Sequence, residues 1–223
     1  MSSTCNHSYR GCVAGVPIFN HLEAEDLDEI MKTVHSSTYQ KGEHLYHAGD
    51  TLGALYIVHK GKVRIYRMNE EGKEQLVRLL SAGDFTGELA LFTNKKEEAY
   101  AEVVEDAQVC RITQDDLHSF LMQYPTIALK IMQEFATRLD TAETQTALFA
   151  QERVETRIAK YLLTCTENNT ARLTMTKRDL ASYLGTTPET ISRRFSDMER
   201  SGIIQKQDSR TFLILDQVQL EEL

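Results

Sequence analysis

The sequence predicts an α+β fold: a domain of short strands, then a long helix, then a helix–turn–helix followed by a hairpin wing. Three observations carry this prediction: strand-like runs broken by glycines between residues 37 and 113, an apolar helical pattern after Pro125, and two amphipathic segments around Gly185. Many short strands that close on themselves favour a roll or barrel. We place the domain boundaries at 1–17, 18–120, 121–150 and 151–223, for the cysteine-bearing N-terminal segment, the roll, the long helix and the winged helix–turn–helix domain.

Length and composition exclude several classes of protein. The 223 residues are enough for two modest domains, and a content of 41% hydrophobic and 26% charged residues is ordinary for a soluble chain. No apolar run of about 18 residues and no secretion signal are present, so we expect a cytoplasmic protein without a membrane partner. The sequence also lacks a glycine-rich phosphate loop, a Ser-His-Asp arrangement and an HExxH motif, which argues against an enzyme.

The net charge of −8 is unevenly distributed. From residue 152 onward, 11 Lys and Arg balance 11 Asp and Glu, so the first part of the chain carries all of the excess. Between Arg172 and Arg210, eight basic residues face five acidic ones. A locally basic face on an acidic protein suits DNA binding whose affinity falls as salt rises.

The elements of the roll follow in order. Residues 22–35 fit a short helix, with Leu27, Ile30 and Val34 on one side. The pattern then changes to strands: LYIVHKGKVRIY is largely apolar around Lys60-Gly61, and NEEGKEQLVRLL places Gly72 between two strand-like runs.

A long helix is predicted after Pro125, because apolar residues recur at helical spacing. This seam could pack on its own domain, but we expect it to pair with its copy in a homodimer, since two-fold dimers read palindromic DNA. The predicted dimer interface comprises Ile127, Ile131, Phe135, Leu139, Ala142 and Phe149.

The helix–turn–helix lies within TMTKRDLASYLGTTPETISRRFSDMERSG. Gly185 permits the chain to leave the first helix, Thr187 suits the N-cap of the second, and Pro188 suits its first position. A helix over residues 151–164 precedes this motif, and residues 203–204 and 211–215 are expected to form a hairpin wing with a basic tip.

The second helix of this motif separates an apolar face from a polar one, as a recognition helix does. Arg193 can donate to guanine and Glu189 can accept from cytosine, although Glu189–Arg193 and Arg194–Asp197 salt bridges are the alternative reading. The candidate contacts to double-stranded DNA are Thr176, Lys177, Arg178, Thr187, Glu189, Thr190, Ser192, Arg193 and Arg194.

The segments GEHLYHAGDTLGALYIVHKGKVRIY, AGDFTGELALF and LTMTKRDLASYLGTTPETISRRF resemble those of the Crp/Fnr family of bacterial transcription regulators. The resemblance covers residues 17–215. It implies an N-terminal β jelly roll of the cyclic-nucleotide-binding type, a dimerisation helix and a C-terminal winged helix–turn–helix. It also implies a contact with RNA polymerase.

Two departures separate this chain from the cyclic-AMP receptors of that family. Glu98 and Ala99 stand where those receptors carry an Arg-Ser pair for the cyclic phosphate, and a carboxylate there is repulsive. Glu189, Ser192 and Arg193 reproduce the E-x-x-S-R pattern of Fnr-like regulators, which implies a palindrome near TTGAT-N4-ATCAA. A regulator that responds to another small molecule is the alternative.

The cysteines suggest how the signal arrives. Fnr-type sensors hold an iron–sulfur cluster on four cysteines, but here only Cys5 and Cys12 precede the roll cysteine, Cys110. The setting resembles that of the Fnr-like proteins of lactic acid bacteria, which implies a reversible disulfide from Cys5 or Cys12 to Cys110. A zinc site that includes His7, an iron–sulfur cluster completed by another ligand, and cysteines without any sensing role remain alternatives. We expect no cofactor, and we expect Cys165 to be a core residue.

Overall fold

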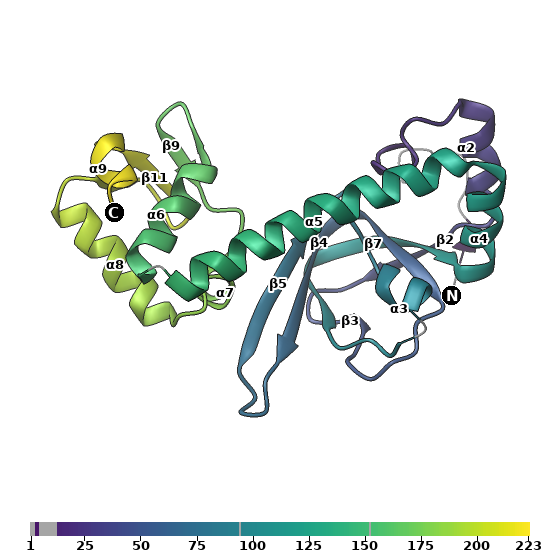
Figure 1. Cartoon of the computed structure of the whole chain (residues 1–223), viewed down its shortest axis with the longest axis horizontal. Coiled ribbons are helices and arrows are strands. Elements are labelled where there is room, and N and C mark those ends of the chain that lie inside the picture. The colour runs from purple at the N-terminus through teal and green to yellow at the C-terminus, as the bar shows by residue number, and fades with distance from the viewer. Residues whose placement is uncertain (1–2, 5–12, 94, 152) are drawn as a thin grey trace. The chain divides into compact units, whose positions relative to one another are not determined.

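The structure, a computed structural model, describes residues 3–4, 13–93, 95–151 and 153–223. It divides into two compact units, residues 1–139 and 140–223, and the long helix α5 (Pro125–Gln151) crosses this division. The first unit contains a β-sheet with helices against it, and the second contains helices with a smaller sheet (Figure 1). The predicted α+β class is confirmed. Within the described ranges, no helix is long and apolar enough to cross a membrane.

The sheet of the N-terminal unit is antiparallel throughout its described pairings and has the order β1-β2-β7-β4-β5, with β3 added on β7 and β6 on β4. Two strands are much longer than the short runs that the sequence suggested, because β4 and β7 pair along most of their lengths. The strands are β1 (Ser3–Thr4), β2 (His35–Tyr39), β3 (His44–Tyr46), β4 (Ala54–Met68), β5 (Glu74–Leu80), β6 (Phe85–Thr86) and β7 (Tyr100–Thr113).

Strand β4 bends without ending at Lys60-Gly61. Its pairing with β7 shifts register on both sides of this dipeptide, as at a β-bulge. Gly61 has a φ of 87°, and a Cβ atom there would lie 2.3 Å from the carbonyl oxygen of Asp106. Only glycine fits such a close approach of two backbones, so this position curves the sheet toward a roll.

The sheet has a hydrophobic core on each face. The roll core lies inside the curved sheet and contains Val58, Val63, Ile65, Val103 and Val109 together with their neighbours. The helix-side core lies on the opposite face, where strand residues meet the N-terminal segment and the helices around it. Its buried members are Val13, Val16, Ile18, Phe19, Ile30, Val34, Leu55, Ile57, Phe85, Cys110, Ile112, Leu117, Phe120, Ile127 and Ile131.

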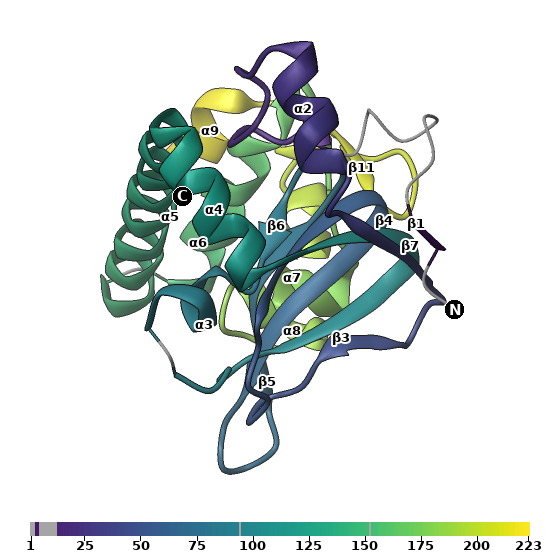
Figure 2. The same cartoon turned by 90° about the vertical axis from the view of Figure 1, so that its right-hand side faces the viewer.

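The helices that lie wholly or partly in this unit and whose bounds are described include α2 (Ala24–Met31), α3 (Glu88–Thr93), α4 (Gln114–Gln123) and the first part of α5. Helix α2 confirms the predicted helix but is shorter, because the chain enters β2 at His35. Helix α4 was not predicted, although Thr113 caps it by accepting a hydrogen bond from the amide of Asp116. Helices α4 and α5 lie on one side of the sheet, where they close the helix-side core (Figure 2).

The C-terminal unit contains α6 (Val154–Thr164), α7 (Lys177–Tyr183), α8 (Pro188–Arg200) and α9 (Gln217–Glu221). Its four-stranded sheet has the order β10-β11-β9-β8, with β8 at Thr166–Glu167 and β9 at Thr170–Arg172. Strands β10 (Ile204–Lys206) and β11 (Thr211–Ile214) form the predicted wing hairpin. Strands β8 and β9 were not predicted; Asn168 and Asn169, both with positive φ, make the tight turn between them.

Candidate nucleic-acid interface and regulatory pocket

The turn between α7 and α8 is held by local hydrogen bonds. The hydroxyls of Thr176 and Thr187 cap the two helices by accepting from the amides of Asp179 and Thr190, both at 3.2 Å. Gly185 has a φ of 64°, which lets the chain leave α7 in the left-handed conformation. Arg157 on α6 donates to the carbonyl oxygen of Leu184 at 2.6 Å and satisfies the end of α7. These contacts fix the orientation of α8 relative to α7 and α6.

Helix α8 has one buried face and one exposed face, as predicted. Ile191, Phe195 and Met198 are buried, and the Phe195 ring packs on Phe212 of the wing with 4.6 Å between centroids. The polar side chains predicted to face away from the core are all exposed: Glu189, Ser192, Arg193 and Ser196. The apolar stripe therefore anchors the helix and leaves the predicted base-reading residues open to a ligand.

Glu189 lies at the N-terminal end of α8 and stays ionised at neutral pH. The pKa of its carboxyl is lowered by its own backbone amide and by the Thr187 hydroxyl, both of which hydrogen bond to the charged form. In the described part of the chain, these groups rather than Arg193 are its partners. The carboxylate can accept a hydrogen bond, and the alternative reading as an Arg193 salt bridge is not observed.

Arg194, a predicted DNA contact, forms ion pairs within its own domain. Its guanidinium lies 3.7 Å from Glu155 of α6 and 3.5 Å from Asp197 of α8, and its Nε is buried. The alternative reading, a salt bridge to Asp197, is therefore observed, and the ion pair with Glu155 joins α8 to α6. The side chain is 35% exposed, and its contact with DNA stays a prediction.

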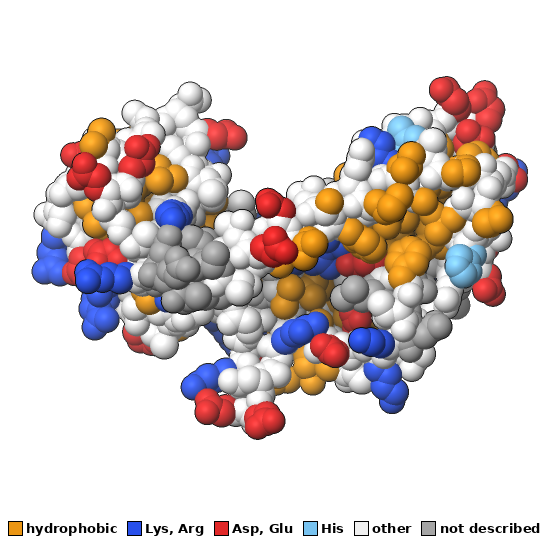
Figure 3. Space-filling view, viewed as in Figure 1, with side chains coloured by type: hydrophobic (Ala, Val, Ile, Leu, Met, Phe, Trp, Pro, Cys, Tyr) orange, Lys and Arg blue, Asp and Glu red, His pale blue; other side chains and the backbone are white. Residues whose placement is uncertain are grey.

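Basic side chains also gather beside α8. The ammonium of Lys177 lies 5.5 Å from the centroid of the Phe195 ring, and its pKa is lowered by burial and by nearby Lys206 of β10. Lys206 was not among the predicted contacts, because nothing in the local pattern shows that the wing returns to α7. The wing tip is ordered by Asp208, whose carboxylate accepts from the amides of Arg210 and Thr211. Figure 3 shows several basic side chains on one side of this unit.

A pocket of about 250 Å³ opens in the roll beside α3. Glu98 is exposed and pairs with Arg67 at 3.1 Å, while Ala99 is buried and offers no hydroxyl. Glu97 also lines the pocket, and the pKa of its carboxyl is raised by burial and by Glu88. The pocket thus holds three carboxylates, of Glu88, Glu97 and Glu98, together with four basic side chains, Arg67, Arg78, Lys95 and Lys96. That it does not take cyclic AMP stays a prediction.

Glu88 is the buried centre of this pocket. One of its oxygens accepts from Arg138 of α5 at 2.5 Å and from Arg78 of β5 at 3.2 Å. Arg138 also donates to Glu134 and lies over the Phe85 ring, 4.3 Å from its centroid. Only glycine fits at position 87, directly before Glu88, because a Cβ atom there would lie 2.7 Å from the Ala54 carbonyl oxygen. The predicted reading of Glu88 as a structural carboxylate fits this geometry, and the sequence did not show that Arg138 would reach it.

The predicted dimer seam divides into two parts. Ile127 and Ile131 are buried in the helix-side core of their own domain, and Phe135 packs partly against it, so the prediction that the first two pair with a second copy is corrected. Leu139 is 60% exposed and Ala142 is also exposed, whereas the side chain of Phe149 is not described. A different stripe is exposed on α5: Leu129, Met132, Ala136 and Leu139. These residues are three and four apart alternately, the heptad spacing of paired helices, and Figure 3 shows exposed hydrophobic side chains along this helix.

The cysteines fall in different surroundings. Cys110 on β7 is fully buried in the helix-side core, and Cys165 is half-buried after α6 rather than in the core. Cys5, His7 and Cys12 lie outside the described residues. Strand β1 ends one residue before Cys5, and Ser3 pairs with Ser36, which in turn pairs with Cys110. Elsewhere in the described chain, no group of His, Cys, Asp and Glu could hold a metal ion.

This combination of a nucleotide-pocket roll, a long helix and a winged helix–turn–helix defines a class of DNA-binding transcription regulators. Residues 36–124 match the cyclic nucleotide-binding domain and residues 156–223 match the Crp-like helix-turn-helix domain. The chain belongs to the Crp/Fnr family, a family of regulators rather than enzymes.

Several relatives support this assignment. The probable transcriptional regulator flp of Lacticaseibacillus casei is 33% identical over 87% of this chain and 90% of its own. The fumarate and nitrate reduction regulatory protein of Vibrio cholerae is 30% identical over 92% and 83%. Among solved structures, the CooA mutant of Carboxydothermus hydrogenoformans has a TM-score of 0.76 at 22% identity, over 87% of this chain and 89% of its own, which supports the fold.

We expect Arg138→Met to lower the free energy of unfolding by about 2–4 kcal/mol, because it leaves the buried Glu88 carboxylate with Arg78 alone. Adding Glu88→Gln to that variant should recover part of the loss, since the two residues act as a pair. Urea titration measures both. Glu134→Gln is the control and should cost less than about 0.5 kcal/mol; an equal loss for Glu134→Gln and Arg138→Met would contradict this role.

Proposed function

We propose that this protein is a dimeric, sequence-specific regulator that reads a TTGAT-N4-ATCAA-like palindrome and whose DNA affinity depends on thiol redox state. The observation that carries the DNA part is the exposed face of α8. There Glu189, Ser192 and Arg193 stand in the E-x-x-S-R pattern while the opposite face is locked into the domain. Because it acts on DNA, we place it in the bacterial cytoplasm, with RNA polymerase as its further partner.

Glu189, Ser192 and Arg193 would each contact a different base of the DNA site. The Arg193 guanidinium suits guanine O6 and N7, and the ionised Glu189 suits a cytosine amino group. Thr176, Lys177, Arg178, Thr187 and Thr190 surround them and suit phosphate oxygens. The Thr176 and Thr187 hydroxyls already cap helices, so they support the interface mainly by holding the helix N-termini toward the phosphates.

Dimerisation is proposed through the exposed stripe of α5, which we call the α5 stripe: Leu129, Met132, Ala136 and Leu139. Three large apolar side chains more than half exposed on one helix are costly in water and are stabilised when a second copy covers them. Phe92 of α3, 46% exposed, packs edge-on against Phe135 and extends the same apolar surface.

Thiol control is proposed through Cys110 with Cys5 or Cys12. Oxidation would join two sulfurs and release two protons and two electrons, which a disulfide oxidant accepts. The pairing of β1 with β2 supports this, because it brings the chain within one residue of Cys5 to the sheet edge two strands from Cys110. Since Cys110 is fully buried, its reaction requires a local opening of the helix-side core.

A regulator controlled by a small molecule other than cyclic AMP is the second candidate. The pocket around Glu88 favours it, because Arg67, Arg78, Lys95 and Lys96 line it together with three carboxylates. Such a ligand would stabilise the protein whether the thiols are reduced or oxidised. Zinc or an iron–sulfur cluster at the cysteines is a third possibility, and metal analysis of the purified protein tests it.

The DNA proposal is tested by fluorescence anisotropy with a TTGAT-N4-ATCAA duplex. Arg193→Ala should weaken binding by about 1–3 kcal/mol and reduce discrimination against a duplex altered at the guanine. Arg178→Ala should instead weaken binding to both duplexes equally and lower the salt dependence. Equal losses on both duplexes for Arg193→Ala, or no binding of the palindrome in any redox state, would remove the proposed site.

Analytical ultracentrifugation tests whether the α5 stripe forms the dimer interface. We expect Met132→Glu to convert the dimer to monomers at micromolar concentration, because it buries a charge at the centre of the stripe. Met122→Glu adds the same charge on α4, where the side chain is 85% exposed, and should leave the dimer intact. A monomeric wild-type protein, or dissociation of both variants alike, would show that the stripe is not the interface.

The thiol proposal is tested by measuring DNA affinity with dithiothreitol and with oxidised dithiothreitol. Wild-type affinity should change severalfold, and Cys110→Ser should abolish the change while Cys165→Ser preserves it. Mass mapping should find Cys110 joined to Cys5 or Cys12. The idea fails if every thiol stays reduced, or if Cys110→Ser responds to the oxidant as the wild-type protein does.

A further inference from the structure

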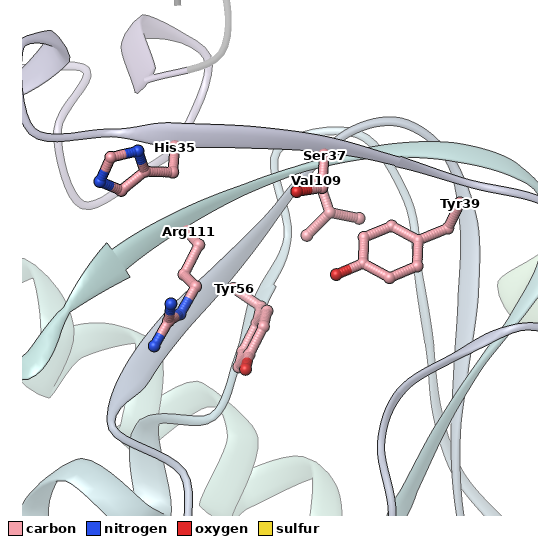
Figure 4. A pocket seen from close by; sticks show the side chains of 6 residues that line it. All are labelled: His35, Ser37, Tyr39, Tyr56, Val109 and Arg111. Carbon is pink, nitrogen blue, oxygen red and sulfur yellow. The ribbon is translucent and has the colours of Figure 1, made fainter. Parts of the chain in front are cut away.

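A second pocket lies on the inner face of the sheet, where β2, β7 and β4 run side by side. It has a volume of about 230 Å³ and is lined by His35, Ser37, Tyr39, Tyr56, Val109 and Arg111 (Figure 4). The strand register explains why these residues meet. His35 pairs with Arg111 and Arg111 pairs with Tyr56, while Ser37 pairs with Val109 on the next row. Alternate residues of each strand share a face, so all six point the same way.

This pocket carries a positive charge and no acidic residue, although the chain has a net charge of −8. No Asp or Glu lines it, and the exposed Arg111 guanidinium makes no ion pair or hydrogen bond with any described residue. The undescribed residues at the N-terminus include no carboxylate side chain that could neutralise it. A guanidinium with its donors available is a strong binding group for a carboxylate or phosphate.

The remaining lining residues add hydrogen-bond donors and flat apolar walls. Figure 4 shows the Tyr39 hydroxyl directed toward Tyr56, with the Arg111 side chain on the other side of the Tyr56 ring. The pKa of Tyr39 is raised by burial and by Tyr56, so its hydroxyl keeps its proton and can donate. The Ser37 hydroxyl lies on the same face, and Val109 is buried at the base of the pocket.

We propose that this pocket binds a small organic oxyanion, with the Arg111 guanidinium on its carboxylate or phosphate. The Tyr56 ring then contacts the body of the ligand, and the Tyr39 hydroxyl, on the other side of that ring, donates to a polar atom farther along it. The site is distinct from the pocket around Glu88, with which it shares no lining residue.

The two pockets are nevertheless connected through aromatic side chains. The Tyr56 ring lies 5.9 Å from that of Tyr46, whose hydroxyl is 2.6 Å from Thr86 Oγ1. Tyr56 also pairs directly with Thr86, two residues before Glu88. A ligand that moves Tyr56 therefore acts on the strand that leads to the Glu88–Arg138 pair.

Isothermal titration with two probes tests the proposal: benzoate, a carboxylate on a flat ring, and inorganic phosphate. We expect saturable binding of at least one probe in the millimolar range or tighter. Arg111→Gln should weaken it about tenfold or more, because it removes the charged donor to the anion. Arg67→Gln, in the pocket around Glu88, is the matched control and should leave the affinity unchanged.

The outcomes separate the possibilities. Binding of benzoate alone assigns the site to carboxylates with an apolar body, whereas equal binding of phosphate shows that the oxyanion suffices. Loss of binding in Arg67→Gln but not in Arg111→Gln would overturn the proposal in favour of the other pocket. Absence of binding of both probes to the folded wild-type protein would also overturn it. None of these measurements depends on DNA or on the thiols. The anion-site proposal and the proposed DNA-binding function can therefore each fail without the other.

Discussion

The two-sided packing of strand β7 is the constraint on which the N-terminal unit depends. This strand pairs with β2, β3 and β4, and its alternate side chains enter two different cores. Val109 faces the interior of the roll, Cys110 faces the helices, and Arg111 returns to the inner face. Because the side-chain period of a strand is two, three consecutive residues serve the roll core, the candidate thiol switch and the candidate anion pocket.

Helix α5 has three faces with different contacts. One face, with Ile127 and Ile131, completes the helix-side core. A second carries Arg138 to the buried Glu88, so the pocket beside α3 contains an internal ion pair. The third face carries the α5 stripe.

The helix–turn–helix was predictable because its determinants are local. Caps at Thr176 and Thr187, the turn at Gly185 and the apolar stripe of α8 lie within about 25 residues of one another, and each acts on its own turn of helix. The exposed positions of Glu189, Ser192 and Arg193 follow from that stripe. The ion pair between Arg194 and Glu155 was not predicted, because Glu155 comes from another helix and periodicity carries no information about such a contact.

The sequence by itself determined the α+β class, the family and the helix–turn–helix with its two-faced second helix. Only the tertiary structure decided which stripe of α5 is buried, that Arg138 pairs with Glu88, and that Arg111 stands in a pocket without acids. The physical reason is the range of the interactions. Helical periodicity, caps and turns depend on neighbouring residues, whereas strand register and buried ion pairs join residues about 50 or more positions apart, as between Glu88 and Arg138 or Tyr56 and Arg111.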